Sequence, residues 1–386
     1  MYRETYLQIP GPTNIPKPIL DALSSKAINH RGDEYAALME FNVKHLKKVF
    51  KTKNDILIFP SSGSGGLEAS IVNTLSPGDK VVAINMGVFS KRYGEIATSF
   101  GAEVTWINQE WGSALNPNRL KDVLSKDFKN EIKAILLTHN ETSTGVTNDL
   151  HALIRVVREL NHPALIFVDA VSSLAITDLP TDLLDIDIVV TGSQKGLMLP
   201  GGLSLISVSK RAWEAHNNAS MPKWYWNFTP MLERMKVGQM PYTPVISHFF
   251  ALKASLEIIE NEGLENIYNR HKQNADAIRN ALEELGLKLL VSDNKYSSNA
   301  VTAVYLPDDI NYEDLSKVLE DDFNVIIGGG LQQLSGKIFR VGHLGNLHKP
   351  EVIAIVTSIE ISLKKLGYTV TLGTAAKAAS RVFLNN

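Results

Sequence analysis

Short apolar runs alternate with longer amphipathic segments over roughly residues 17–209 of the chain. Apolar positions that recur every three or four residues predict helices, and such segments cover Glu34–Lys51, Gly65–Leu75, Val88–Phe100, Asn118–Ser125 and Asp149–Leu160. Apolar runs without polar alternation are typical of strands buried on both faces, and they cover 55–59, 80–84, 103–107, 133–138, 164–169, 187–191 and 203–208. This alternation predicts an α/β fold with a mostly parallel central sheet.

The pattern changes after this region. Residues 221–244 are rich in Pro, Trp and Met and show little periodicity, and a helical run then covers Val245–Glu260 and continues after Gly263 toward Leu285. In the remainder, strands are predicted at 287–292, 299–306, 324–329 and 337–342. Helices are predicted at Tyr312–Leu319 and Lys349–Leu366. We therefore expect a large domain at 17–260 and a smaller α+β domain made of 1–16 and 261–386. The tail, 373–386, is compatible with a helix or a frayed end.

Composition narrows the class of function. The chain has 386 residues, a formal net charge of −2 and no cysteine. Without a basic excess we expect no nucleic-acid partner, and without cysteine no disulfide, thiolate nucleophile or cysteine-bound metal is possible. No apolar run is long enough to span a bilayer, and the first residues do not resemble a secretory signal. We expect a cytoplasmic protein with small-molecule substrates, no membrane association and no metal site.

Asp169 and Lys195 follow two of the apolar runs. Asp169 ends the run 164–169, where an ionised carboxylate without a partner would be costly. Lys195 comes shortly after the run 187–191, among small and turn-forming residues. Ligands of parallel sheets collect at the carboxyl ends of the strands. A pyridoxal-phosphate (PLP) site needs such a pair, because a lysine amine forms the Schiff base and an acid keeps the pyridine nitrogen protonated. Taken singly, each residue has an alternative, a turn-capping Asp or a solvated Lys.

A glycine-rich loop follows the run 55–59. The segment FPSSGSGGLEASI (59–71) passes from a strand through Gly and Ser into a predicted helix. Backbone N–H groups at such a helix start bind anions, and glycine lets the ligand approach closely. The segment matches neither dinucleotide nor triphosphate motifs, so the phosphate of PLP is the ligand it would accept. A plain strand–helix turn is the competing interpretation.

Three further features contribute to the prediction. In LTHNETSTGV (137–146), Thr142 is placed to donate to the phenolic oxygen of PLP, whereas the role of His139 stays open. Phe89 follows NMGV and is either a ring that stacks on the pyridine or a core residue. Arg340 lies within the apolar run of KIFRVGHLG (337–345). Its planar guanidinium suits the carboxylate of an amino acid or oxo acid, with a structural salt bridge as the alternative.

Together these motifs resemble the class V aminotransferases, and within them the alanine–glyoxylate and serine–pyruvate group. The similarity begins at IPGPTNIPKPIL (9–20), which is similar to the N-terminal PGP-[ST]-N segment of that family, and continues in order over nearly the whole chain. The matching segments are SGSGGLEASIVNTLSPGD, THNETSTGV, IFVDAVSSL, TGSQKGLMLPGGLS and FRVGHLG.

The resemblance implies a PLP-transferase fold of type I, the aspartate-aminotransferase-like architecture. It implies PLP held by Lys195 as a Schiff base, with Asp169 at the pyridine nitrogen and Arg340 at the substrate carboxylate. The other cofactor contacts implied by the family are Ser64, Gly65, Gly66 and Gln194 at the phosphate, Thr142 at the phenolic oxygen and Phe89 as the stacking ring. The segment with Gly11 and Asn14 would line the pocket.

The family also forms homodimers in which a Tyr/Thr loop completes the partner's phosphate site. Here this loop would be PYTPVIS (241–247), with Tyr242 and Thr243 as the candidate residues. Two departures from the family are Gly66 in place of a histidine and Phe89 in place of a tryptophan. Backbone donation survives the first change and stacking survives the second.

The sequence thus predicts an aminotransferase that moves an amino group from alanine or serine to glyoxylate or pyruvate through a pyridoxamine form of the cofactor. Amino acids and 2-oxo acids would be its partners, together with a second copy of the chain. The alternatives are another donor, such as 2-aminoethylphosphonate, ureidoglycine or aspartate. From a different class, a nicotinamide-binding or non-catalytic α/β protein would show similar strand–helix alternation.

Overall fold

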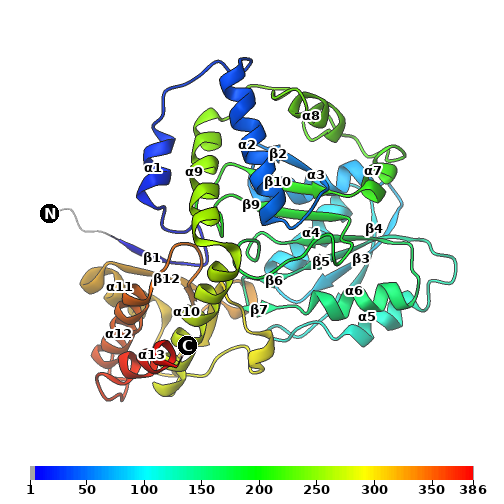
Figure 1. The fold of residues 1–386 in the computed structure, drawn as a ribbon. Coiled ribbons are helices and arrows are strands. Elements are labelled where there is room, and N and C mark those ends of the chain that lie inside the picture. Colours follow the sequence, from blue (N-terminus) through cyan, green and yellow to red (C-terminus); the bar gives the residue numbers. More distant parts are fainter. Residues whose placement is uncertain (1–4, 386) are drawn as a thin grey trace.

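The computed structural model describes residues 5–385, and Figure 1 shows a large sheet covered by helices beside a smaller sheet. The large sheet has seven strands. In spatial order they are β2 (Asp55–Phe59), β10 (Ser204–Val208), β9 (Ile188–Gly192), β8 (Leu165–Asp169), β5 (Ile132–Thr138), β3 (Lys80–Asn85) and β4 (Glu103–Asn108). Strand β10 is antiparallel to both of its neighbours, β2 and β9, and all the other neighbouring strands pair in parallel. The α/β fold with a mostly parallel sheet is confirmed.

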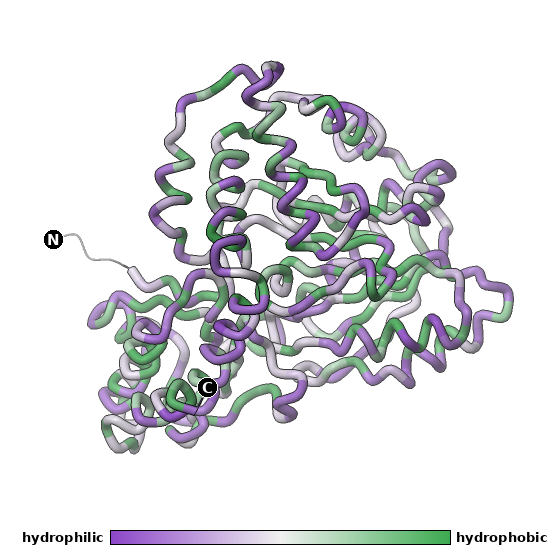
Figure 2. Tube along the Cα trace, in the orientation of Figure 1, coloured by the Kyte–Doolittle hydropathy of each residue, from purple (hydrophilic) through white to green (hydrophobic). Residues whose placement is uncertain are grey.

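Helices pack on both faces of this sheet. They are α1 (Lys17–Leu23), α2 (Asp33–Val49), α3 (Gly63–Thr74), α4 (Val88–Ser99), α5 (Pro117–Leu124), α6 (Leu150–Glu159), α7 (Lys210–His216), α8 (Phe228–Met235) and α9 (Ile246–Glu262). Strands β8, β9 and β10 are buried at every position, as expected of largely apolar strands covered on both faces. Figure 2 shows that the central strands are mostly hydrophobic and that the outer helices are amphipathic, with hydrophobic and hydrophilic residues alternating along them.

The smaller sheet joins the two ends of the chain. Its spatial order is β1 (Tyr6–Gln8), β12 (Val325–Gly329), β13 (Ile338–Gly342) and β11 (Val301–Tyr305). Helices α10 (Leu264–Glu284), α11 (Tyr312–Phe323), α12 (Lys349–Lys365) and α13 (Thr374–Leu384) pack beside it (Figure 1). The hydrophobic core changes from one cluster to a second within α10, between Ile267 and Ala277. The predicted domain boundaries stay a prediction.

Several segments differ from the sequence-based prediction, which did not include α1, α7 or β1. Residues 287–292 do not form a strand, because the pairing with β11 is limited to one bridge, Leu289 with Val304. The chain then turns at Asp293, whose carboxylate accepts from the N–H of Lys295 at 3.0 Å, into a short 3-10 helix at Asn294–Tyr296.

Another difference is α8, inside the region that showed little periodicity. Asn227 caps this helix by accepting from the N–H of Thr229 at 3.1 Å, and Phe228, Met231 and Met235 form its buried side. The tail forms α13, which buries Ala375, Ala378 and Ala379. A second 3-10 helix, Gln332–Leu334, and a small hairpin, β6 (Asn140–Glu141) with β7 (Val146–Thr147), complete the elements. Within residues 5–385, no helix has both the length and the apolar character that crossing a membrane requires.

Candidate active site

The carboxyl ends of three neighbouring parallel strands carry the residues that the sequence singled out. Asp169 is the last residue of β8 and pairs in register with Thr138, the last residue of β5. Strand β9 lies on the other side of β8 and ends at Gly192, three positions before Lys195. Parallel strands end at one edge of a sheet, so the fold delivers these side chains to the same region.

Asp169 is a buried carboxyl group, with 5% of its surface exposed. Its Oδ1 accepts a hydrogen bond from the backbone N–H of Val171 at 2.9 Å. Burial raises the pKa of Asp169 from 3.8 to about 7, against the opposing effects of that hydrogen bond and of the positive charges on Arg92 and Lys195. A buried carboxylate of this kind favours a cationic partner, such as a protonated pyridine nitrogen.

Lys195 is also buried, with 9% of its surface exposed. Burial lowers the pKa of its amine from 10.5 to about 8, and the charge of Arg340 acts in the same direction, whereas Asp169 opposes both. Its Nζ donates to the carbonyl oxygen of Pro10. Gly11 lies directly against it, because a Cβ built at Gly11 would fall 2.4 Å from Nζ. The N-terminal segment therefore covers the lysine, and the role of Gly11 in lining the substrate pocket stays a prediction.

The glycine-rich loop forms the first turn of α3. The N–H groups of Gly65 and Gly66 lie 3.0 and 3.4 Å from the carbonyl oxygen of Ser62. The N–H groups of Gly63 and Ser64, the first two residues of α3, are among those that a helix start leaves for a ligand. A Cβ at Gly66 would lie 2.7 Å from Val190 and 2.9 Å from Ser204, so packing of α3 on the sheet is sufficient to require glycine there.

Gln194 reaches this helix start from the other side. A Cβ at Gly192 would lie 2.8 Å from Gln194 Oε1 and 3.3 Å from the N atom of Gly63, which places the amide near the first turn of α3. Gln194 Oε1 is buried, and no hydrogen-bond partner for it exists within residues 5–385. With its amide turned over, Gln194 would direct its NH2 group, a hydrogen-bond donor, toward an anion at the helix start.

Phe89 lies at the start of α4, held by a residue that the sequence analysis did not identify. The fully buried carboxylate of Glu141 accepts from the N–H groups of Phe89 at 3.3 Å and Ser90 at 2.7 Å. It also accepts from the N–H and hydroxyl of Ser143, at 3.0 and 2.7 Å. The one sequence feature that could have identified Glu141 is its charge, within the otherwise uncharged segment NETSTG (140–145). The position of Phe89 is therefore fixed from a second loop.

Thr142 and Arg340 meet although they are far apart in the sequence. Arg340 Nη1 donates to the carbonyl oxygen of Thr142 at 3.1 Å, and its Nε donates to that of Gly329 at 2.8 Å. The Thr142 hydroxyl donates to Ser172 at 2.7 Å. Arg340 is 7% exposed, and no acidic side chain forms a salt bridge with it within residues 5–385. The structural salt bridge considered for it is thus missing from the described part of the chain.

His139 is buried behind this edge of the sheet. Its backbone N–H donates to the carbonyl oxygen of Asp169 at 2.9 Å, which ties the ends of β5 and β8 together. Burial lowers the pKa of the His139 ring to about 4, so the ring is neutral at pH 7. The backbone of this residue supports Asp169, and its side chain carries no charge.

Asn14, Tyr242 and Thr243 lie in other surroundings. Asn14 is exposed, and its amide exchanges two hydrogen bonds of 3.3 Å with the backbone of Leu7. Tyr242 stacks on Trp224 and Tyr225, with ring centres 5.1 and 4.9 Å apart, and Thr243 is exposed. Their suggested contacts with pocket and partner stay predictions.

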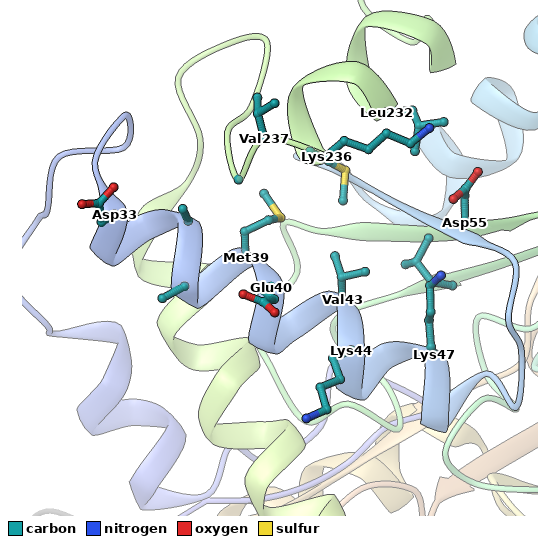
Figure 3. A pocket seen from close by; sticks show the side chains of 15 residues that line it. Asp33, Met39, Glu40, Val43, Lys44, Lys47, Asp55, Leu232, Lys236 and Val237 are labelled. Atoms are coloured by element: carbon teal, nitrogen blue, oxygen red, sulfur yellow. The ribbon is translucent and has the colours of Figure 1, made fainter.

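A groove of about 800 Å³ lies between α2 and α8, and Figure 3 shows that lysine and acidic side chains line it together with apolar ones such as Met39 and Val43. None of the candidate site residues described above lines it. Its lining residues are Asp33, Ala36, Ala37, Met39, Glu40, Val43, Lys44, Lys47, Asp55, Ile56, Leu232, Met235, Lys236, Val237 and Gly238. The buried lysine, carboxyl and arginine lie at the sheet edge instead, so we locate the chemistry there.

The residues at the sheet edge fit PLP. Asp169 is a buried acid near a buried amine, Gln194 has an unpartnered oxygen at a helix start, and Arg340 is a buried cation without a salt bridge in the described part of the chain. By contrast, residues 5–385 contain no group of three or more His, Cys, Asp and Glu side chains that would hold a metal ion. This fold and site define a PLP-dependent enzyme of fold type I.

Comparison with known proteins identifies the family. The aminotransferase class-V family model matches residues 5–342, so the chain belongs to the class V aminotransferases. It is 38% identical to an L-aspartate–glyoxylate aminotransferase of Paracoccus denitrificans, covering 96% of this chain and 94% of the relative. It is 37% identical to a serine–glyoxylate aminotransferase of Arabidopsis thaliana, covering 97% and 94%. The predictions of a PLP-dependent aminotransferase and of its family are confirmed.

Two further similarities bear on specificity. The chain is 40% identical to a protein of Synechococcus sp. named the small subunit of a soluble hydrogenase, over 99% of both chains. The structure of the ureidoglycine–glyoxylate aminotransferase of Bacillus subtilis superposes with a TM-score of 0.92 at 25% identity, covering 100% of this chain and 99% of the other. The aspartate–glyoxylate and serine–glyoxylate relatives, at 38% and 37% identity, thus carry different donor names.

Proposed function

We propose that this aminotransferase moves the amino group of alanine or serine to glyoxylate or pyruvate, with Lys195, Asp169 and Arg340 as its central residues. The observation that carries the proposal is the pair of buried groups, an amine with a pKa of about 8 and a carboxyl with a pKa of about 7, each affecting the pKa of the other. Titratable groups shifted in this way cluster at catalytic sites.

Bound PLP supplies a carbonyl for the amine and an electron-accepting ring. Lys195 is the residue that holds it, and Asp169 provides the negative charge for its pyridine nitrogen. With a pKa of about 8, roughly one Lys195 amine in ten is neutral at pH 7, far more than for an exposed lysine. The neutral Nζ can take a proton from the α-carbon of the amino acid and return one to the other substrate.

Arg340 selects the substrates. Its guanidinium has a planar set of donors that matches one carboxylate, and hydrogen bonds to Gly329 and Thr142 hold it in place. A single arginine fits monocarboxylates such as alanine, serine, glyoxylate and pyruvate. Aspartate would need a further cation for its second carboxylate. The chain has nearly the same sequence identity to an aspartate–glyoxylate and to a serine–glyoxylate enzyme, so the choice of alanine or serine as the amino donor rests on Arg340.

The hydrogenase name of one relative does not suit the residues of this chain. Iron–sulfur clusters are held by cysteine thiolates, and this chain has no cysteine. The PLP site accounts for the buried lysine, acid and arginine, so the aminotransferase proposal is favoured.

We also propose a cytoplasmic homodimer. In support of the dimer, Trp224 is 74% exposed and Tyr225 37% exposed on the surface where Tyr242 stacks. Exposed aromatic residues are enriched in protein interfaces. The proposed domains are 17–260 and 1–16 with 261–386, and their support is the change of core cluster within α10.

The experiment is a colour test with a panel of amino acids. Purified protein should be yellow with PLP, should bleach with alanine or serine, and should regain its colour with glyoxylate or pyruvate. The panel includes aspartate, 2-aminoethylphosphonate and ureidoglycine to test the other donors. Lys195→Ala should abolish the cycle, whereas Lys236→Ala, at an exposed lysine outside the site, should preserve it. A wild-type protein that stays colourless with added PLP would refute the proposal.

A further inference from the structure

Arg92, in the second turn of α4, contacts two of the proposed cofactor-binding residues. Its Nη1 donates to the hydroxyl oxygen of Ser64 at 3.2 Å. Its guanidinium carbon lies 4.9 Å from the centre of the Phe89 ring, a cation–π distance. Arg92 thereby connects the proposed phosphate turn of α3 to the proposed stacking ring of α4. Nothing in the sequence pattern singled it out.

The proposed phosphate turn lacks a positive charge of its own. The phosphate of PLP carries a charge of about −1.5 to −2 near neutral pH, as other phosphate monoesters do. The segment 59–71 contains no Lys, Arg or His, and its one charged residue, Glu68, is acidic. Among residues 5–385, Arg92 is the one cationic side chain with a hydrogen bond to this segment.

The direction of that hydrogen bond matters. A serine hydroxyl has one hydrogen to donate and two lone pairs that accept. Since Arg92 donates to Ser64 Oγ, the hydroxyl hydrogen stays available for an anion at the start of α3. A donor polarised by a neighbouring guanidinium forms a stronger hydrogen bond to a charged acceptor. The anion also gains the attraction of the guanidinium at longer range.

We infer that Arg92 is a positioning residue that makes the site selective for the phosphorylated form of the cofactor. Through Ser64 it provides the positive charge for the phosphate, and through its cation–π contact it holds Phe89 against the pyridine. The inference rests on the proposed function, because it takes PLP as the ligand of Lys195. The inference predicts two separate effects of Arg92, one on binding of the phosphate through Ser64 and one on stacking of the pyridine ring through Phe89.

The two effects can be measured with two ligands. Apoprotein of the full chain is titrated with PLP and with pyridoxal, which lacks the phosphate, and the visible spectrum gives both dissociation constants. Arg92→Met should weaken PLP binding roughly tenfold or more, as expected for the loss of a charge-assisted contact. Pyridoxal binding should weaken less than about threefold. Arg92→Lys should recover most of the affinity for PLP, because it restores the charge.

Two further variants complete the test. Lys91→Met removes a positive charge from the same helix, where Lys91 pairs with Glu95 at 3.0 Å, and should leave both affinities unchanged. Ser64→Ala should weaken PLP binding in the same direction as Arg92→Met, and the double variant Ser64→Ala with Arg92→Met should lose little more than Arg92→Met alone.

Three outcomes would overturn the inference. If Arg92→Met lost the same affinity for PLP and for pyridoxal, Arg92 would act only by holding Phe89 in place. If it lost affinity for neither ligand, Arg92 would have no role in cofactor binding. If the losses in PLP-binding free energy of the two single variants added up in the double variant, Arg92 would not act through Ser64. Failure of the proposed function gives a different result, because wild-type protein would then bind neither PLP nor pyridoxal. Far-UV circular dichroism of each variant verifies its fold.

Discussion

Replacing Asp169 by asparagine should stabilise the cofactor-free protein at neutral pH and change how its stability depends on pH. Burial raises the pKa of Asp169 from 3.8 to about 7. Between these pH values the folded protein holds a proton that the unfolded chain has released, so stability falls as pH rises. The loss is about 1.4 kcal/mol per pH unit, on the order of 4 kcal/mol over the window. Asparagine is neutral at every pH and suffers no such loss.

Urea unfolding of both apoproteins, followed by far-UV circular dichroism between about pH 4 and pH 8, measures this effect. The difference in unfolding free energy, variant minus wild type, should grow with pH up to about 7 and then level off. Asp21→Asn is the control, because that carboxylate is exposed and pairs only with Lys17 on the surface. A difference that is independent of pH, or that shrinks as pH rises, would refute the reasoning.

Bound PLP should reverse the advantage of the variant. A protonated pyridine nitrogen near Asp169 is a partner for the ionised carboxylate, and asparagine cannot provide the charge. PLP should therefore raise the unfolding free energy of the wild type more than that of Asp169→Asn. An equal rise in both proteins would argue against the assignment of Asp169 to the pyridine nitrogen.

Three other substitutions test the site and its scaffold. Arg340→Gln should raise the KM for pyruvate or glyoxylate about tenfold or more, with little change in PLP affinity, and an unchanged KM would contradict its role. Gly11→Ala should weaken PLP binding, because its Cβ would lie 2.4 Å from the Nζ of Lys195. Gly78→Ala shares a positive φ but has no atom within 4 Å of the new Cβ, so it should leave PLP binding unchanged, and equal effects would exclude the contact as the cause. Phe167→Ala, at a fully buried position in β8, should cost about 3–5 kcal/mol in urea unfolding, and a loss under about 1 kcal/mol would contradict its place in the core.

The differences between prediction and structure have local causes. The segment 287–292 is apolar enough for a strand, yet pairing beside β11 is limited to the bridge at Leu289 because the chain turns at Asp293. Helix α8 was missed because Pro and Trp residues around it obscured a short amphipathic stretch, although Phe228, Met231 and Met235 have helical spacing. In both places the apolar pattern was short, and tertiary packing decided the outcome.

The sequence by itself determined the strands of the large sheet, because a strand buried on both faces needs a largely apolar run, and β8, β9 and β10 are such runs. It also indicated Asp169, Lys195 and Arg340, since charged residues beside or within such runs need a partner or a ligand.

Only the tertiary structure decided which side chains meet. The carbonyl of Pro10 accepts from a lysine 185 positions away, and the carbonyl of Thr142 accepts from an arginine 198 positions away. The contact of Arg92 with Ser64 and the anchoring of Phe89 by Glu141 likewise join separate loops. Such contacts depend on strand order and on the path of the loops, and neither leaves a periodic trace in the sequence.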